Sequence, residues 1–229
     1  MNWLKQLFFP SFCVGCLRPG PYLCAACLKK KRTYQQQRCL YCQRPSPLGL
    51  THLFCQRTTR VDAALSLYYY QWPLTNLIKE IKFRHRTKAL YFLLDSIPPE
   101  HWEQVEKLIG LLFRPTISYV PLSFYELRNR GFNQAEIIAQ YLAQRLRAPL
   151  STLLIKRKKT KKQSMIQIKQ RKQNINKAFL FKQTALKNYK SILLIDDVIT
   201  SGATINEAAR AIKTKKQLRV FVFSLFRAN

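Results

Sequence analysis

Two adjacent carboxylates, Asp196 and Asp197, lie just before the hydroxyl-rich run Thr200–Thr204 in an otherwise basic part of the chain. The apolar residues 191–195 predict a buried strand before them, and a helix is predicted to begin at Ala203. Hydroxyl groups, a glycine and the free N–H groups of a helix start suit a phosphate, and paired carboxylates accept hydrogen bonds from a sugar diol or face a Mg²⁺-bound ligand. The pattern predicts a sugar-phosphate site, whereas an ordinary strand–loop–helix with a helix cap accounts for only part of the run.

Seven cysteines form a second set of chemically active side chains, and six of them occur in Cys-x-x-Cys pairs. Close pairs and an odd total argue against a secreted disulfide framework and favour metal ligation in a reducing compartment. One such pair supplies two of the four ligands of a tetrahedral zinc ion, and a second pair completes the coordination shell. We therefore expect a structural zinc ion on the first two pairs, which are Cys13, Cys16, Cys24 and Cys27.

The remaining cysteines predict a second zinc site of mixed composition. Cys39 and Cys42 form a pair, but Cys55 is followed by Thr58 where a symmetric partner cysteine would lie. His52 lies three residues before Cys55, so we expect a Cys₃His site, with an ordinary surface histidine as the alternative. Spacing alone leaves the pairing open, because the first and third cysteine pairs can also share one ion. Both ions are expected to fold a segment that is too small to hold itself together.

The charge of the chain is strongly positive and unevenly distributed. Lys and Arg number 40 against 11 Asp and Glu, which gives a net charge of +29, and residues 1–60 and 137–195 contain no acid. Such a field attracts phosphate-rich partners, either a nucleic acid or a small polyphosphate, although a solvated lysine-rich surface is the alternative. We expect single-stranded DNA as a partner, with aromatic residues such as Phe83 and Tyr34 available to stack on bases.

The elements that position these residues alternate between strands and helices. Apolar runs predict strands at Val61–Tyr70, Ile117–Val120, Leu153–Ile155, Ser191–Ile195 and Arg219–Phe226. Helical periodicity predicts helices at Pro73–Phe83, Lys88–Ser96, Asn133–Leu146 and Ala203–Lys213. This order predicts an α/β fold with a mainly parallel sheet flanked by helices.

Composition also predicts how the chain is divided and where it works. With 229 residues, 47% of them hydrophobic, it is long enough for one domain with a sizeable core and a small module. We expect a cysteine-rich zinc module at residues 1–60 and the α/β domain at residues 61–229. No signal-peptide pattern and no apolar run of membrane-spanning length is present, so a cytoplasmic location is the expectation.

The acidic loop resembles the signature by which type I phosphoribosyltransferases bind phosphoribosyl pyrophosphate (PRPP). Two further blocks resemble one branch of that superfamily, the ComF (competence protein F) family. These are Val120-Pro121-Leu122 with Arg128 and Arg130-Gly131-Phe132-Asn133-Gln134-Ala135, and the spaced set Arg157, Thr160, Gln163, Arg171, Asn174 and Phe179. The paired cysteines fit an N-terminal double zinc ribbon of that family. Departures are Thr58, where an eighth cysteine is usual, and Tyr119, where proline is common.

The resemblance implies a role for each block. Asp196 and Asp197 would face the ribose hydroxyls, and the 5′-phosphate would lie on the backbone and side chains of Thr200, Ser201, Gly202, Ala203 and Thr204. The pyrophosphate side would be formed by Arg128, Arg130, Gly131, Asn133 and Gln134, with Mg²⁺ accompanying PRPP. Residues 157–174 could close over the substrate as a hood. Arg130, Arg157 and Arg171 are the candidate catalytic residues.

The resemblance implies a PRPP-binding, phosphoribosyltransferase-like protein linked to DNA uptake in natural transformation, with a competence helicase as a further partner. The activity would be pentosyl transfer from PRPP, and the acceptor cannot be identified from the residues. The alternative is a catalytically inactive module that binds single-stranded DNA and keeps PRPP as a regulatory or vestigial ligand. Fold resemblance alone does not establish turnover.

Overall fold

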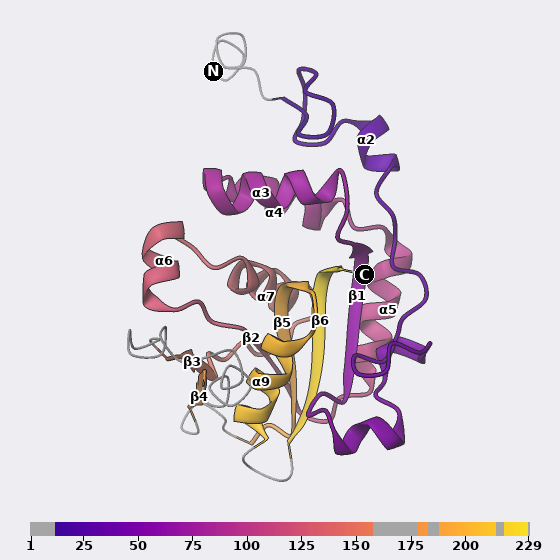
Figure 1. Ribbon diagram of the computed structural model, residues 1–229, viewed down its shortest axis with the longest axis vertical. Coiled ribbons are helices and arrows are strands. Elements are labelled where there is room, and N and C mark those ends of the chain that lie inside the picture. The colour runs from indigo at the N-terminus through magenta and orange to yellow at the C-terminus, as the bar shows by residue number, and fades with distance from the viewer. Residues whose placement is uncertain (1–11, 158–177, 183–187, 214–217, 229) are drawn as a thin grey trace, which may run out of the picture.

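The computed structural model describes residues 12–157, 178–182, 188–213 and 218–228 (Figure 1). Its centre is a four-stranded sheet in the order β1-β6-β5-β2, and every neighbouring pair is parallel. The strands are β1 (Ala63–Tyr69), β2 (Pro115–Tyr119), β5 (Ser191–Ile199) and β6 (Arg219–Arg227). The mainly parallel α/β fold predicted from the sequence is confirmed.

Helices surround this sheet. They are α2 (Ala25–Lys29), α3 (Leu74–Arg84), α4 (Thr87–Asp95), α5 (Pro99–Gly110), α6 (Phe124–Arg130), α7 (Gln134–Arg145) and α9 (Ala203–Ile212), with 3₁₀ turns η1 (Pro47–Gly49) and η2 (Leu53–Arg57). Figure 1 shows α3 lying across the end of the sheet at which β5 and β6 finish. That edge is where parallel α/β sheets place their ligands.

Three of these helices, α2, α5 and α6, were not predicted from the sequence. Pro98 and Pro99 do separate α4 from α5, but Pro99 occupies the first helical turn, where proline is tolerated because its missing N–H has no partner there. The start of α6 is fixed by a capping box in which the Ser123 side chain accepts from the Glu126 backbone N–H and the Glu126 carboxylate accepts from the Ser123 backbone N–H.

The two faces of the sheet build two apolar cores. Leu193 and Ile195 of β5 belong to the core formed with α3, α4, α5 and α7, whereas Ile192 and Leu194 belong to the core formed with α9. Alternate residues of one strand point to opposite faces, so a continuous apolar strand is required when both faces are covered.

A separate two-stranded antiparallel sheet pairs β3 (Leu154–Lys156) with β4 (Phe179–Phe181). The short strand predicted at 153–155 therefore exists but does not join the central sheet. Residues 158–177, which include Arg171 and most of the predicted hood, lie outside the described residues.

The cysteine-rich segment packs on the α/β core from both sides. Val14 and Leu23 belong to the core that contains α3, whereas Leu40 belongs to the core that contains α9. The boundary at residue 60 stays a prediction, and apolar side chains on its two sides share the same cores. Within the described ranges, no helix is long and apolar enough to span a membrane.

Candidate functional site

A cavity of 310 Å³ opens at the edge of the sheet where β5 ends. The loop after β5, the loop after β2, the last turns of α3 and α6, the start of α7 and the end of β3 all contribute to it. Its lining residues are Tyr70, Lys82, Val120, Pro121, Leu122, Glu126, Arg130, Asn133, Gln134, Lys156, Asp196, Asp197, Val198, Thr200 and Thr204. The structure thus brings the acidic pair, two of the loop threonines and part of the predicted pyrophosphate side into one cavity.

The two carboxylates at the end of β5 are held by backbone and charge contacts. Asp196 Oδ1 accepts from the Asp197 N–H (2.9 Å), and Asp197 Oδ1 accepts from the Val198 N–H (3.0 Å). Burial, followed by the neighbouring charge of Asp197, raises the pKa of Asp196 to about 8. Asp197 is paired at 2.5 Å with Lys82, a residue of α3 that the sequence analysis did not identify. The pair therefore contains one carboxyl that is protonated near neutral pH and one that faces a cation.

The loop after these carboxylates leads directly into α9. Gly202 is the N-cap of α9 at φ +73°, a left-handed conformation that favours glycine, and it has no side chain to cap the helix. The Ser201 hydroxyl accepts from the Ala203 N–H at 3.4 Å. Thr200 and Thr204 line the cavity, whereas Ser201, Gly202 and Ala203 do not. The loop thus presents the hydroxyl groups of Thr200 and Thr204 to the cavity, and Thr204 lies in the first turn of α9, which favours an anion.

The predicted pyrophosphate side divides into residues that face the cavity and residues that do not. Arg130 and Gln134 line it and contact each other, with Arg130 Nη1 donating to Gln134 Oε1 at 2.9 Å. Gln134 Nε2 is buried and donates to no acceptor among the described residues. Arg128 and Gly131 are not lining residues; Arg128 is exposed on α6, and Gly131 ends that helix at φ +73°.

Asn133 also lines the cavity, but its side chain is already occupied. Its Oδ1 accepts from the Ala135 N–H at 3.0 Å, which caps α7, and its Nδ2 donates to the Val120 carbonyl at 3.0 Å. Asn133 therefore joins the loop after β2 to the start of α7 and acts as a structural residue at this site.

Lys156 and Glu126 form a charged pair at the cavity that sequence reasoning missed. The Lys156 ammonium lies 2.8 Å from Glu126 Oε2. Burial opposes ionisation of Glu126, but hydrogen bonds from Lys156 and Ser123 outweigh it and lower the pKa of that carboxyl to about 2. The signal in the sequence was the capping box, which anchors Glu126. The predicted Arg157 is exposed and does not line the cavity.

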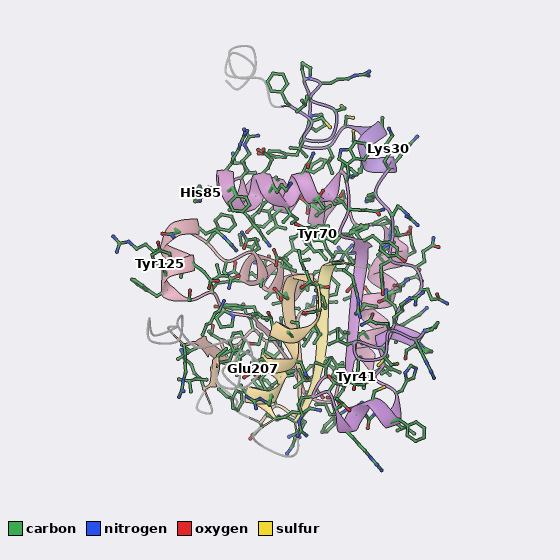
Figure 2. All side chains as sticks on the ribbon, in the orientation of Figure 1. Lys30, Tyr41, Tyr70, His85, Tyr125 and Glu207 are labelled. Atoms are coloured by element: carbon green, nitrogen blue, oxygen red, sulfur yellow. The ribbon has the colours of Figure 1, made fainter. Side chains whose placement is uncertain are left out.

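The chain segment 130–132 is fixed to the end of α3 by His85. The His85 Nδ1–H donates to the Arg130 carbonyl at 2.7 Å, and its ring meets the Phe132 ring edge-on at 6.3 Å. Figure 2 shows His85 on the same side of the molecule as Tyr125 of α6. This contact fixes the position of α3, which carries Lys82, relative to the end of α6, which carries Arg130.

The first predicted zinc ligands, Cys13, Cys16, Cys24 and Cys27, form one cluster with all four sulfur atoms within 4.8 Å of one another. The Cys16 and Cys24 sulfurs are 3.8 Å apart. That is the edge of a tetrahedron whose ligands lie about 2.3 Å from a central zinc ion, namely about 3.8 Å. Burial opposes ionisation of Cys13, but backbone N–H groups from Cys24, Cys16 and Gly15 lower the pKa of its thiol to about 6. The thiolate needed by a metal is therefore favoured, and the four residues could hold zinc.

Cys39, Cys42, His52 and Cys55 form the second cluster, also with ligand atoms within 4.8 Å of one another. The His52 Nε2–H donates to the Pro45 carbonyl at 3.2 Å, and Nδ1 lies 3.2 Å from the Cys42 sulfur. A histidine that donates its other ring N–H to a carbonyl is oriented as metal ligands are. The crossed pairing of cysteines left open by spacing does not occur, and His52 lies with the second set.

The segment that carries the second cluster makes three contacts with the end of the sheet, the loop after β5 and α9. Leu40 packs against Gly202, and Arg227 Nη2 donates to Gln43 Oε1 at 2.9 Å. Asn206 Oδ1, in the first turns of α9, accepts from the Arg60 backbone N–H at 2.9 Å. Because Arg227 pairs with Ile199 in the sheet, the segment that carries the second cluster touches the strand end, the loop and the helix.

One aromatic residue expected to stack on bases is not available. Tyr34 is 4% exposed and packs against Tyr69 and Arg227, whereas Phe83 is 74% exposed. The basic neighbours of Tyr34 led to the prediction that it lies on the surface. Instead its backbone N–H donates to the Leu67 carbonyl, so Tyr34 lies along the edge of β1 and is buried there.

Comparison with known proteins agrees with these features. Residues 129–229 match the phosphoribosyl transferase domain family. Competence protein F of Haemophilus influenzae is 28% identical over 234 residues, which cover 95% of this chain and 91% of that protein. The DNA utilization protein YhgH of Escherichia coli K12 is 26% identical over 231 residues (97% and 99%), and competence protein ComFC of Bacillus subtilis is 25% identical over 228 residues (93% and 87%).

Proposed function

Because the chain belongs to the ComF family of phosphoribosyltransferase-like proteins, we propose that its cavity binds PRPP with Mg²⁺ and that the protein handles single-stranded DNA during DNA uptake. It would work in the cytoplasm, with a competence helicase as a partner. The observation that carries the proposal is the meeting of Asp196 and Asp197 with threonine hydroxyls and three cations in one cavity.

The ribose 5-phosphate end suits the β5–α9 loop. Carboxylates repel phosphates but accept hydrogen bonds from neutral hydroxyls, so Asp196 and Asp197 fit the ribose diol. The phosphate fits the hydroxyls of Thr200 and Thr204 and the N–H groups at the start of α9.

The pyrophosphate end suits the cations of the cavity. Lys82, Arg130 and Lys156 line it from three different elements. Lys82 is paired with Asp197 and Lys156 with Glu126, whereas Arg130 forms no ion pair among the described residues. Gln134 Nε2 is a buried donor with no acceptor among the described residues, and a phosphate oxygen would satisfy it. Bound Mg²⁺ would supply further neutralisation of the pyrophosphate charge.

Phosphoribosyl transfer is the reaction that this arrangement supports. The bond from C1′ to the pyrophosphate oxygen breaks, a bond from C1′ to the acceptor forms, and C1′ carries positive charge between the two events. The protein contributes position, exclusion of water and stabilisation of the leaving group by Arg130, Lys82 and Lys156. No protein nucleophile is required.

A second function, binding without turnover, rests on the charge of the chain. The net charge of +29 suits a DNA backbone, and relatives carry competence and DNA utilization names. In this alternative PRPP is a regulatory or vestigial ligand. Detection of pyrophosphate release from PRPP in the presence of candidate acceptors separates it from the enzyme.

Calorimetry with PRPP, with and without Mg²⁺, tests the central claim. The double variant Asp196→Asn/Asp197→Asn keeps the shape of the site but weakens the charge-assisted bonds to the hydroxyls. It should lose roughly thirty- to a thousandfold in PRPP affinity, which corresponds to about 2–4 kcal/mol. Its affinity for single-stranded DNA should stay unchanged or rise slightly, because the negative charge of the acidic pair is removed.

The matched control is Glu103→Gln/Glu106→Gln, which neutralises two exposed acids on α5 that do not line the cavity. This variant should bind PRPP like the wild type. Unchanged PRPP binding by the Asp196/Asp197 variant would remove the proposal. Equal loss of PRPP and DNA binding would indicate one shared site or a damaged fold.

A further inference from the structure

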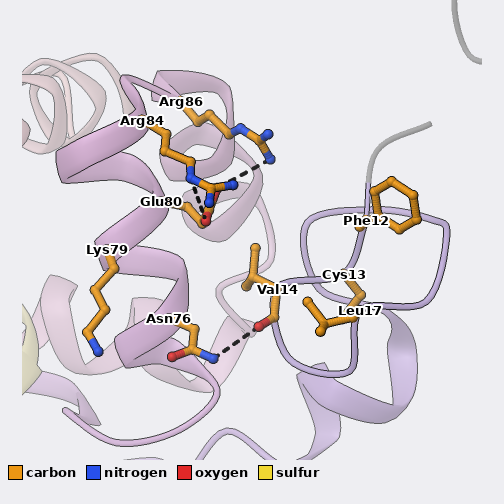
Figure 3. Close-up of a pocket in the computed structure, with 9 residues that line it drawn as sticks. All are labelled: Phe12, Cys13, Val14, Leu17, Asn76, Lys79, Glu80, Arg84 and Arg86. Atoms are coloured by element: carbon orange, nitrogen blue, oxygen red, sulfur yellow. Dashed lines mark hydrogen bonds and ion pairs between the residues drawn. The ribbon is translucent and has the colours of Figure 1, made fainter. Parts of the chain in front are cut away.

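A groove of 490 Å³ lies between the first cysteine cluster and α3, apart from the PRPP cavity (Figure 3). It has one apolar wall and one charged wall. The lining residues are Phe12, Cys13, Val14, Leu17, Asn76, Lys79, Glu80, Arg84 and Arg86. None of them lines the cavity at the end of β5.

The apolar wall is formed by residues 12–18, the turn around Cys13 and Cys16 that we call the first cysteine knuckle. Phe12 is 45% exposed and Leu17 is 76% exposed. The turn that carries them is closed by two backbone hydrogen bonds, from the Leu17 N–H to the Cys13 carbonyl (2.8 Å) and from the Cys13 N–H to the Arg18 carbonyl (2.9 Å). Leu17 adopts φ +62°, a conformation that L-residues rarely take. A well-ordered turn therefore holds two large apolar side chains out of the core.

The opposite wall is cationic. Figure 3 shows Arg84 and Arg86 both paired with the Glu80 carboxylate, and each arginine has a guanidinium nitrogen 3.4 Å from a Glu80 carboxylate oxygen. Lys79, one residue earlier on α3, is exposed and forms no ion pair with any residue that the structure describes. The three cations exceed the one acid by two charges, so the groove is attractive to anions.

The two walls are joined rigidly. Asn76 Nδ2 donates to the Val14 carbonyl at 3.1 Å, and Val14 belongs to the same core as Leu77 and Ile81 of α3. The spacing between the apolar side chains of the knuckle and the cations of α3 is therefore fixed by packing. A ligand that combines flat apolar groups with regularly spaced phosphates would meet both walls at once.

We propose that this groove binds single-stranded nucleic acid, with a base against Phe12 and Leu17 and backbone phosphates on Lys79, Arg84 and Arg86. The inference rests on the proposed handling of single-stranded DNA and locates it. A base in a duplex is covered by its neighbours, whereas a base in a single strand can lie against an aromatic ring. Phe83, 74% exposed one turn beyond Lys79, extends the aromatic surface along the same helix.

The groove and the PRPP cavity are both lined by residues of α3 but share no lining residue. Lys79 lines the groove, and Lys82, three residues later, pairs with Asp197 in the cavity. The two ligands therefore use different side chains, and we expect them to bind together without competing.

Fluorescence anisotropy with a labelled oligothymidine tests whether the groove binds single-stranded DNA. Some variants should weaken binding and one should strengthen it. Lys79→Gln/Arg84→Gln removes two phosphate contacts and should weaken binding roughly a hundredfold at about 50 mM salt, and lower the slope of log affinity against log salt by about 1.4. Phe12→Ala should weaken binding with the salt slope unchanged, because no phosphate contact is lost. Glu80→Gln removes the acid of the groove and should strengthen binding.

The matched control is Lys107→Gln/Arg147→Gln, which removes two exposed cations outside the groove and should have a much smaller effect. Calorimetry should show wild-type PRPP affinity for every groove variant. If the groove and control variants lose affinity equally, or if Glu80→Gln weakens binding, the groove is not the site. If the wild-type protein fails to bind the oligonucleotide at low salt, the proposed DNA function itself is wrong.

Discussion

Leu40, beside the second cysteine knuckle, lies directly against Gly202 in the loop that leads into α9. A Cβ atom added at Gly202 would be 2.8 Å from Leu40 Cδ1 and 3.1 Å from Leu40 Cγ. Gly202 also holds φ +73°. The conformation of the loop proposed to bind the 5′-phosphate therefore depends on its own backbone and on a side chain of the cysteine-rich segment.

Substitution at both residues should reveal this contact as an energetic coupling. Gly202→Ala should destabilise the protein by about 1–2 kcal/mol from the positive φ alone, with more from the displaced leucine. Leu40→Ala should cost about 2–5 kcal/mol, because a buried side chain is lost. The double variant should be more stable than the sum of the two losses predicts, since alanine at position 40 leaves room for the new Cβ. Urea denaturation of the four proteins measures the coupling, and strict additivity would contradict the contact.

Metal analysis of the purified protein should return two zinc ions per chain. Cys13→Ser/Cys16→Ser and Cys39→Ser/Cys42→Ser should each lose one ion, and the first of these should leave the N-terminal segment unfolded. His52→Ala should lower the occupancy of the second ion only.

The two double serine variants also separate the roles of the clusters. Loss of the second ion should weaken PRPP binding more than loss of the first, because Leu40 and Gln43 connect the second knuckle to the loop and strand end at the cavity. A return of one ion from the wild-type protein, or equal effects of both variants on PRPP affinity, would contradict this arrangement.

The raised pKa of Asp196 predicts how stability changes with pH. Its carboxyl ionises near pH 4 in the unfolded chain and near pH 8 in the folded one, so the folded state binds the extra proton between these values. Its contribution to folding is therefore favourable below about pH 4 and is lost as the pH rises towards 8, with a slope of at most about 1.4 kcal/mol per pH unit.

Asp196→Asn is the matched comparison, because it cannot ionise. Relative to this variant, the wild-type protein should lose unfolding free energy steadily between about pH 4 and pH 8, measured by chemical denaturation without PRPP. A difference between the two proteins that does not change with pH would contradict the raised pKa.

Lys82→Met should destabilise the protein by about 1–3 kcal/mol at neutral pH. Asp197 Oδ2 is buried, its contact among the described residues is the Lys82 ammonium, and removal of the cation leaves the charge uncompensated. A second substitution, Asp197→Asn, should restore most of the loss because it removes that charge. If the double variant is less stable than Lys82→Met alone, the ion pair is not the cause.

The residue types at the cavity and at the metal clusters were readable from the sequence because each motif is contiguous. Asp196, Asp197 and the threonine loop are neighbours in the chain, and so are the members of each Cys-x-x-Cys pair. The same holds for the alternation of apolar strands and periodic helices, since local periodicity reports which face of an element is buried. The parallel α/β fold and the two clusters of potential metal ligands followed from such short-range patterns.

Contacts between distant segments could be found only in the tertiary structure. No local sequence pattern connects Lys82 with Asp197 or Leu40 with Gly202, and none indicates that Tyr34 is buried. The choice between direct and crossed cysteine pairing was of the same kind, because equal spacing makes the pairs chemically equivalent until packing separates them. The sequence by itself determined which chemical groups are available, whereas packing determined which of them meet, because the free energy of a close contact depends on positions in space and not on separation along the chain.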